Sequence, residues 1–342
     1  DEADSCAAFA VAAPIASYEV SGTGYAHSNV TASSCQIFAA SSCHSTGIHV
    51  DPGKDLFLKR ANRDHAYVLC ETLTEESALQ APDNNPNAAY MLVVSLQDPT
   101  SPTIVGMLPK PSPFSAAASV TVSGPLHAYV TDYSESALMV VWILDAAQPE
   151  VIGVASDPEI LNGPVAAAVI ETGLGESVTH VCVVGVLSDS VAMVDVSRPT
   201  SPTIVGYVAS VDKLRRASAV VIGGSYAYIT SQESTYDLTV VDISTAMEPT
   251  IVGTLSASTV RNSLVSSLRR AGVALNGGFA YVVTDKSLKI IDVSDPSRPT
   301  LLGVAEDSQL LAQPCSVAVQ GEVAYVGSPD ANALAVVDVS DA

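Results

Sequence analysis

The 342-residue chain is 48% hydrophobic and only 15% charged, which is enough apolar material for a large core and excludes a disordered polypeptide. Its formal net charge of -21 opposes binding to nucleic acid and to anionic lipid. No apolar run reaches the roughly 18 residues that a membrane-spanning helix needs. We therefore expect no nucleic-acid partner and no membrane insertion.

The N-terminal residues predict an exported protein. The chain begins DEADSC at Asp1, without an initiator methionine or a hydrophobic leader, as it would after removal of a signal peptide; an incomplete N-terminus would look the same. Six cysteines in an acidic chain and an N-glycosylation sequon at Asn29 fit an oxidising compartment. We expect a secreted glycoprotein, extracellular or on a cell surface.

The cysteines divide into two groups. Four lie in or beside the irregular N-terminal repeats, namely Cys6, Cys35, Cys43 and Cys70. We predict two disulfides among these four, and of the three connectivities we prefer Cys35 with Cys43 and Cys6 with Cys70. Cys182 and Cys315 lie too far apart around the predicted ring to pair, so we interpret both as small buried hydrophobes. The chain has no Cys-x-x-Cys pair, which argues against a zinc site.

A repeat of about 50 residues covers nearly the whole chain. Each unit has an alternating apolar segment, a Gly-containing turn, an Ala-Tyr-Val segment, a polar stretch, a Val-Val-Asp segment and a Pro-rich turn leading into Pro-Thr-Ile-Val-Gly. Seven copies are traced through Ala26, Ala66, Ala128, Thr179, Ala227, Ala280 and Ala324. The segments are short and rich in Val, Ile, Thr and Tyr, which predicts four strands in each unit.

Sheets that bury their faces against one another in a ring form a propeller. We therefore predict an all-β fold, a seven-bladed β-propeller with four-stranded blades; six blades with an N-terminal extension are the alternative. The chain is expected to be a single domain over 1–342. Its repeats cover about 16–50, 51–106, 107–153, 154–206, 207–253, 254–303 and 304–342.

The last repeat reaches VVDVSDA without another Pro-Thr-Ile-Val-Gly segment. We predict that residues 1–15 supply the missing outer strand, through a segment around Phe9 to Ala13. This strand would join the first and last blades and leave no open sheet edge.

Three segments carry a family likeness: LTVVDIS at 238–244, LKIIDVSDPSRP at 288–299 and LAVVDVSDA at 334–342, each following an Ala-Tyr segment. They resemble the repeats of the LVIVD-repeat family of surface-associated β-propellers. The likeness is good over 107–342 and degenerate over 16–106. It implies a surface location and supplies no catalytic residues.

Histidine and aspartate recur at fixed repeat positions. His65 and His127 share one position, and His27 and His180 share another. Equivalent positions on different blades are rotated apart around the axis, so we interpret these histidines as polar residues of the repeat and expect no metal site. Four carboxylates end the Val-Val-Asp strand and are expected to bond the N–H groups of the following turn: Asp195, Asp242, Asp292 and Asp338. We expect no cofactor; Ca²⁺ held by several loops stays an alternative.

The few basic residues are concentrated. Six of the 15 lie in two corresponding connections between repeats: Lys213, Arg215, Arg216, Arg261, Arg269 and Arg270. Residues 260–270 also have apolar side chains at helical spacing, which predicts a short helix. One interpretation is a solvated basic patch. The other is a contact for an acidic surface, either an anionic glycan or another copy of this chain, and such unlike contacts generate filaments.

The chain has no G-x-S-x-G elbow, no H-E-x-x-H, no P-loop and no G-x-G-x-x-G. We expect no enzyme and predict a noncatalytic extracellular scaffold or adhesion protein, specifically a subunit of a fibre or matrix, with itself, other extracellular proteins or glycans as partners. A propeller that binds a ligand or glycan through its channel or basic face is the alternative. A lectin is weakened because Trp142, within a strand, is the sole tryptophan. A hydrolase or lyase whose site is assembled from loops is the second alternative.

Overall fold

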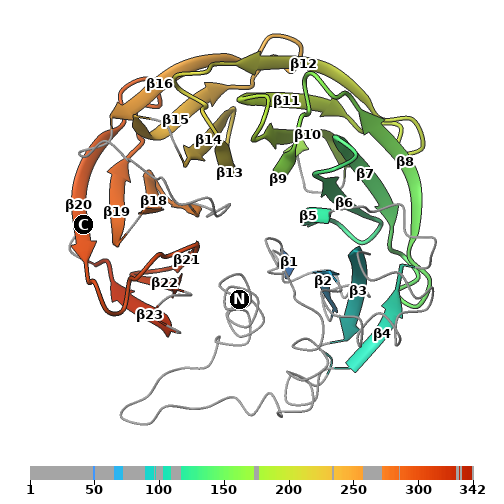
Figure 1. The fold of residues 1–342 in the computed structure, drawn as a ribbon, viewed down its shortest axis with the longest axis horizontal. Helices are drawn as coiled ribbons and strands as arrows, with labels where there is room; N and C mark the ends of the chain where they lie inside the picture. Colours follow the sequence, from blue (N-terminus) through green and yellow to red (C-terminus); the bar gives the residue numbers. More distant parts are fainter. Residues whose placement is uncertain are drawn as a thin grey trace.

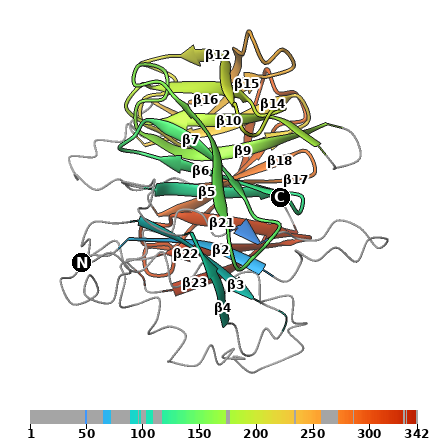
Figure 2. The same cartoon turned by 90° about the vertical axis from the view of Figure 1, so that its right-hand side faces the viewer.

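The computed structural model describes residues 49–50, 65–71, 89–95, 97, 103–108, 117–172, 177–232, 235–256, 272–284, 286–328, 331 and 333–340. These residues form six antiparallel sheets, here called blades A to F, arranged around a central axis as a β-propeller (Figure 1). Inner strands such as β5 and β9 run across the thickness of the ring (Figure 2). The described residues contain no helix that is long and apolar enough to cross a membrane.

Five blades have four strands that follow one another from the axis to the rim. Blade A contains β1 (His49–Val50), β2 (His65–Glu71), β3 (Ala89–Ser95) and β4 (Thr103–Met107). Blade B contains β5 (Ala117–Ser123), β6 (His127–Asp132), β7 (Ala137–Trp142) and β8 (Glu150–Ser156). Blade C contains β9 (Pro164–Thr172), β10 (Ser177–Gly185), β11 (Ser190–Asp195) and β12 (Thr203–Ala209).

The remaining blades follow the same order. Blade D contains β13 (Ala217–Gly223), β14 (Tyr226–Ser231), β15 (Tyr236–Asp242) and β16 (Thr250–Ser256). Blade E contains β17 (Val273–Asn276), β18 (Phe279–Thr284), β19 (Ser287–Asp292) and β20 (Thr300–Glu306). Blade F has three described strands, β21 (Ser316–Gln320), β22 (Val323–Ser328) and β23 (Ala333–Asp338).

The prediction of seven blades is wrong, and the alternative of six is confirmed. His49 and Val50, which the sequence placed at the end of the first repeat, pair with Tyr67 and Ala66 as the innermost strand of blade A. These two residues therefore complete the second unit instead of ending a separate one. The predicted closing strand at 9–13 lies outside the described residues and stays a prediction.

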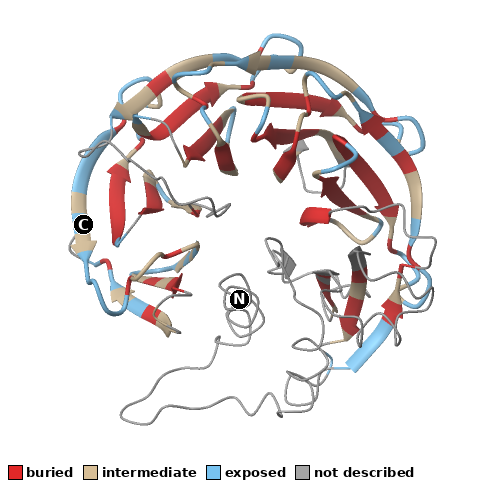
Figure 3. Cartoon of the chain, in the orientation of Figure 1, coloured by how far each residue is buried: buried red, intermediate tan, exposed pale blue. Residues whose placement is uncertain are grey.

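The core lies between the blades, because each central strand buries both of its faces. In β7, Met139 and Val141 pack into a cluster with blade A, while Leu138 and Val140 pack into a cluster with blade C. This alternation follows from the period of two in a strand. Figure 3 shows the result, with the central strands buried and the rim strands largely half-buried or exposed.

Glycines on the rim strands mark where neighbouring blades meet. A Cβ on Gly106, Gly153, Gly206 or Gly253 would overlap a backbone carbonyl oxygen in the turn of the next blade. The turn after each third strand therefore docks closely over the preceding rim strand. Gly303 of β20 differs, because a Cβ there would meet only the Ile290 Cδ1 atom, at 3.9 Å, among the described residues.

Candidate functional site

The strand ends define two faces of the ring. The connection face carries the links between blades and the hairpins between second and third strands. The turn face carries the hairpins between first and second strands and the turns between third and fourth strands. Because every strand runs from one face to the other, residues at opposite strand ends belong to opposite surfaces.

The first basic connection, residues 210–216, joins β12 to β13 on the connection face. Its Leu214 side chain is fully buried. The Arg216 N–H donates to Asp189 Oδ1 at 2.8 Å, and the Thr239 hydroxyl donates to the Lys213 carbonyl oxygen at 2.7 Å. Arg215 is exposed, whereas Lys213 and Arg216 are half-buried. This segment is anchored to blades C and D and carries three basic side chains beside one exposed acidic side chain, Asp212.

The second basic connection, with Arg261, Arg269 and Arg270, lies outside the described residues, and so does the short helix predicted over 260–270. Asn29, Cys6, Cys35, Cys43 and the Cys70 side chain also lie outside them. The glycosylation site stays a prediction.

The four strand-ending aspartates behave as predicted. Each accepts a hydrogen bond from the N–H of the serine two residues later, at 2.8 to 3.0 Å: Asp195, Asp242, Asp292 and Asp338. Hydrogen bonds from Ser197 hold the pKa of Asp195 below its usual value, and the Ser294 N–H does the same for the pKa of Asp292. These carboxylates shape turns on the turn face.

The histidine register differs from the prediction. His65, His127 and His180 all occupy the same repeat position, opposite Ser95, Trp142 and Asp195 respectively. The pairing makes Val181, not Thr179, the equivalent of Ala128, since Val181 lies opposite Val194 as Ala128 lies opposite Val141. Within the described residues, no three His, Cys, Asp or Glu side chains gather closely enough to hold a metal ion.

The two remaining cysteines are unlike each other. Cys182 is a free, fully buried thiol, and burial raises its pKa to about 12, so its interpretation as a small hydrophobe is confirmed. For Cys315 that interpretation is wrong. Cys315 is half-buried and disulfide-bonded. Because Cys182 is free, the partner of Cys315 is one of the other four cysteines, so the prediction of two disulfides among those four is wrong. The interpretation from sequence considered only Cys182 as a partner for Cys315. It overlooked a bond to one of the other four cysteines.

Blade B departs from the other blades at its end on the turn face. Where blades C to F have the aspartate that bonds a serine N–H, blade B has Trp142 and Leu144. Trp142 lies directly between His127 on β6 and Glu150 on β8, so these three side chains share one side of the sheet. Leu144 and Leu126 are 52% and 42% exposed. The Leu126 carbonyl oxygen accepts the Ile143 N–H at 2.9 Å, which places the two leucine-bearing turns side by side.

We call Leu126, His127, Trp142, Leu144 and Glu150 the Trp142 patch. Trp142 and His127 are half-buried, and Glu150 is exposed. The sequence treated Trp142 as an interior strand residue and missed this surface. The signal was available in the repeat, because blades C, D, E and F have Asp and Ser at the two positions where blade B has Trp and Leu.

His127 predicts a measurable pH dependence of stability. Burial lowers its pKa below 6.5, so the folded protein favours the neutral imidazole. A lowered folded-state pKa contributes stability that is present above pH 6.5 and is lost as the pH falls through the folded pKa. We expect the free energy of unfolding in urea to fall below pH 6.5, and to fall less in His127→Phe, which copies Phe279 of blade E. Equal losses in both proteins would contradict this assignment.

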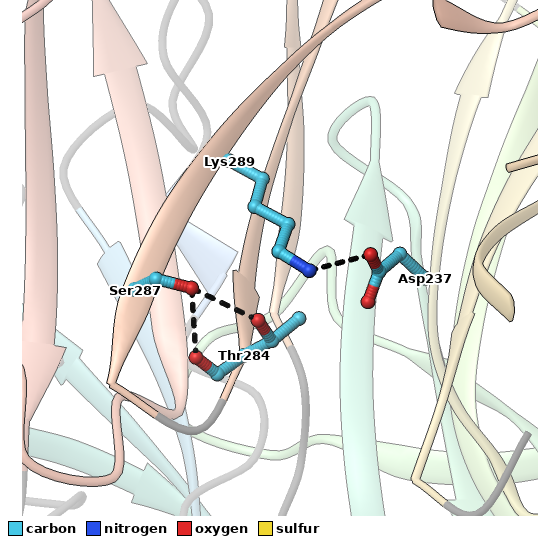
Figure 4. A network of polar contacts seen from close by, with 4 residues as sticks. All are labelled: Asp237, Thr284, Ser287 and Lys289. Atoms are coloured by element: carbon cyan, nitrogen blue, oxygen red, sulfur yellow. Dashed lines mark hydrogen bonds and ion pairs between the residues drawn. The ribbon is translucent and has the colours of Figure 1, made fainter. Parts of the chain in front are cut away.

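A buried ion pair joins blades D and E. The Lys289 ammonium on β19 donates to Asp237 Oδ2 on β15 at 2.5 Å, and the two side chains are only 8% and 2% exposed (Figure 4). Beside it, the Ser287 hydroxyl donates to the Thr284 carbonyl oxygen at 3.2 Å. Sequence reasoning missed this pair. Its position inside the interface between two blades indicates a structural link.

Comparisons with known proteins agree with this architecture. The LVIVD repeat family matches residues 183–210, 214–256, 271–307 and 313–342. No curated protein matches the chain. Among solved structures, the periplasmic gluconolactonase of Pseudomonas aeruginosa is 13% identical, with a TM-score of 0.57, and the match covers 82% of this chain and 84% of that protein.

Two other solved structures are similar. A candidate 6-phosphogluconolactonase of Bacteroides uniformis is 12% identical, with a TM-score of 0.61, over 81% of this chain and 78% of that protein. A protein of unknown function from Desulfotomaculum acetoxidans is 13% identical, with a TM-score of 0.54, over 73% and 75%. At these identities the likeness concerns the fold alone. Together, the six blades of the described residues and the four matched repeats identify the chain as a β-propeller that contains LVIVD repeats.

Proposed function

We propose that the protein is a noncatalytic scaffold or adhesion module of the extracellular space or cell surface, which acts by binding an acidic surface through the basic connection at 210–216. The observation that carries the proposal is the way this segment is held. Buried Leu214 and two hydrogen bonds to blades C and D fix its backbone, so its cations are presented without a large loss of conformational freedom on binding.

The charge balance supports the same function. The chain has 36 acidic residues against 15 basic ones, whereas residues 210–216 have three basic residues and one acidic residue, so this segment is opposite in sign to the chain as a whole. Opposite potentials on two partners orient their encounter and select against wrong partners. The candidate partners are an anionic glycan and an acidic surface of another copy.

Charge reversal tests the proposal directly. Arg215→Glu is expected to abolish self-association and binding to anionic glycans, because it places a carboxylate where the partner is acidic. Sedimentation velocity and a glycan-binding assay are the measurements. Arg298→Glu is the matched control, since it makes the same change in net charge at an exposed position in the turn of blade E. Equal behaviour of the two variants would contradict the proposal.

Lactone hydrolysis is a second candidate, favoured by the fold shared with a periplasmic gluconolactonase and a candidate 6-phosphogluconolactonase. Hydrolysis of gluconolactone and 6-phosphogluconolactone by the purified chain, followed by acid release, tests it. Turnover above the spontaneous rate would favour this candidate over the scaffold.

A further inference from the structure

We propose that the Trp142 patch is the docking surface for the basic connection of a second copy of this chain, so that propellers join head to tail. This inference rests on the proposed function and specifies its partner. It concerns the described residues 126–150 on one copy and 210–216 on the other.

Local stability does not explain the Trp142 patch. In blades C to F, an aspartate at this position accepts a turn N–H, a bond of the kind that contributes about 0.5–1.5 kcal/mol net. Trp142 has no oxygen with which to accept one, and Leu144 replaces an exposed serine by an apolar side chain that is 52% exposed. Blade B lacks this bond, although the Ala147 N–H donates to Asp145 Oδ1 at 3.0 Å in the same turn, and it has gained exposed apolar surface, which is the pattern of a binding site.

The basic connection is complementary to this patch in both charge and polarity. Arg215 is exposed, and a guanidinium stacks favourably on an indole ring with a carboxylate beside it, as Glu150 is beside Trp142. Val211, in the same connection, is 70% exposed and matches the apolar Leu144. Trp and Arg are the residue types that most often dominate the energy of an interface.

The positions of the two surfaces determine the kind of assembly. The Trp142 patch lies on the turn face of blade B, whereas the basic connection lies on the connection face between blades C and D. When each contact joins the Trp142 patch of one copy to the basic connection of the next, one copy at the end of the oligomer keeps an unoccupied patch and the copy at the other end keeps an unoccupied basic connection. Further copies can therefore add at both ends, and the assembly grows as an open chain. At about 0.15 M salt the Debye length is about 8 Å. Salt therefore weakens the long-range repulsion between two acidic propellers more than it weakens the attraction between charges in direct contact.

The first experiment restores the repeat. Trp142→Asp with Leu144→Ser gives blade B the turn of blades C to E, so its fold should be retained, as near-UV circular dichroism and urea unfolding will show. We expect the wild-type chain to form oligomers of increasing length with concentration. The double variant should need more than about tenfold higher concentration for the same degree of assembly.

The second experiment uses the single tryptophan. The Arg215→Glu chain keeps its Trp142 patch, and the Trp142→Asp, Leu144→Ser chain keeps its basic connection and has no tryptophan. Each alone should be monomeric, and their mixture should form a dimer that grows no further. All tryptophan emission in the mixture comes from the patch, so it should shift to shorter wavelength as the tryptophan-free partner is added.

Each result decides between the possibilities. A dimer with a blue shift supports the docking of these two surfaces. Assembly that is lost in Arg215→Glu but persists in the Trp142 double variant overturns this inference and leaves the proposed function standing. A wild-type chain that stays monomeric, or one whose patch binds a glycan and no second copy, overturns the inference. Assembly unaffected by either variant overturns both proposals.

Discussion

Replacing Lys289 by methionine is expected to lower the free energy of unfolding by about 3–5 kcal/mol, because it leaves the Asp237 carboxylate buried without its partner. Asp237→Ala should be destabilising in the same way, since it strands a buried ammonium. Urea unfolding at pH 7 measures both effects.

The chain supplies its own control for this pair. Blade B has Ala137 at the position of Asp237 and Met139 at the position equivalent to Lys289, and both are buried there. The double variant Asp237→Ala, Lys289→Met therefore places at each position a side chain that the repeat already buries there. We expect it to be within about 1 kcal/mol of the wild type, or more stable, because well-packed apolar residues often equal a buried ion pair. A double variant destabilised by the sum of the two single effects would show that the two side chains do not act as a pair.

The blades could be predicted from the sequence because the features that define them, strand composition and turn hydrogen bonds, involve residues close together in the chain. Strands such as 238–242 are short runs of β-branched and apolar residues, and the strand-ending aspartates bond to serines two residues away. The number of blades depended on whether His49 and Val50 end one unit or begin the next. Only pairing across strands, here with Ala66 and Tyr67, decides that.

The ion pair was hidden for a related reason. Asp237 corresponds to Ser287 in the repeat and Lys289 to Thr239, so the partners occupy different repeat positions on different blades. Their contact depends on how neighbouring sheets are offset, and no single sequence states this offset. The Trp142 patch, by contrast, is visible in the sequence as a place where one copy departs from the others.

Gly303 provides the test of ring closure. Gly253→Ala should lower the free energy of unfolding by about 1–3 kcal/mol, because the new Cβ would overlap the Pro296 carbonyl oxygen. The described residues leave space over the equivalent Gly303, and the edge of β23 has no fourth strand among them. In the other blades the covering carbonyl belongs to the fourth residue after the strand-ending position, which corresponds to Ala342 in blade F. If the segment around Phe9 to Ala13 forms the missing strand, it should hold this turn over Gly303 as the turns cover the other rim glycines.

We therefore expect Gly303→Ala to be destabilising in the full chain by an amount comparable with Gly253→Ala, and to have little effect in a chain that lacks residues 1–15. Gly253→Ala should be equally costly in both chains, which makes it the internal control. The comparison needs four urea unfolding curves, and the non-additivity between Gly303→Ala and the deletion measures the contact. A Gly303→Ala variant as stable as the wild type would show that the N-terminal segment does not pack there, and the edge of β23 would then be closed by some other means or left for a partner strand.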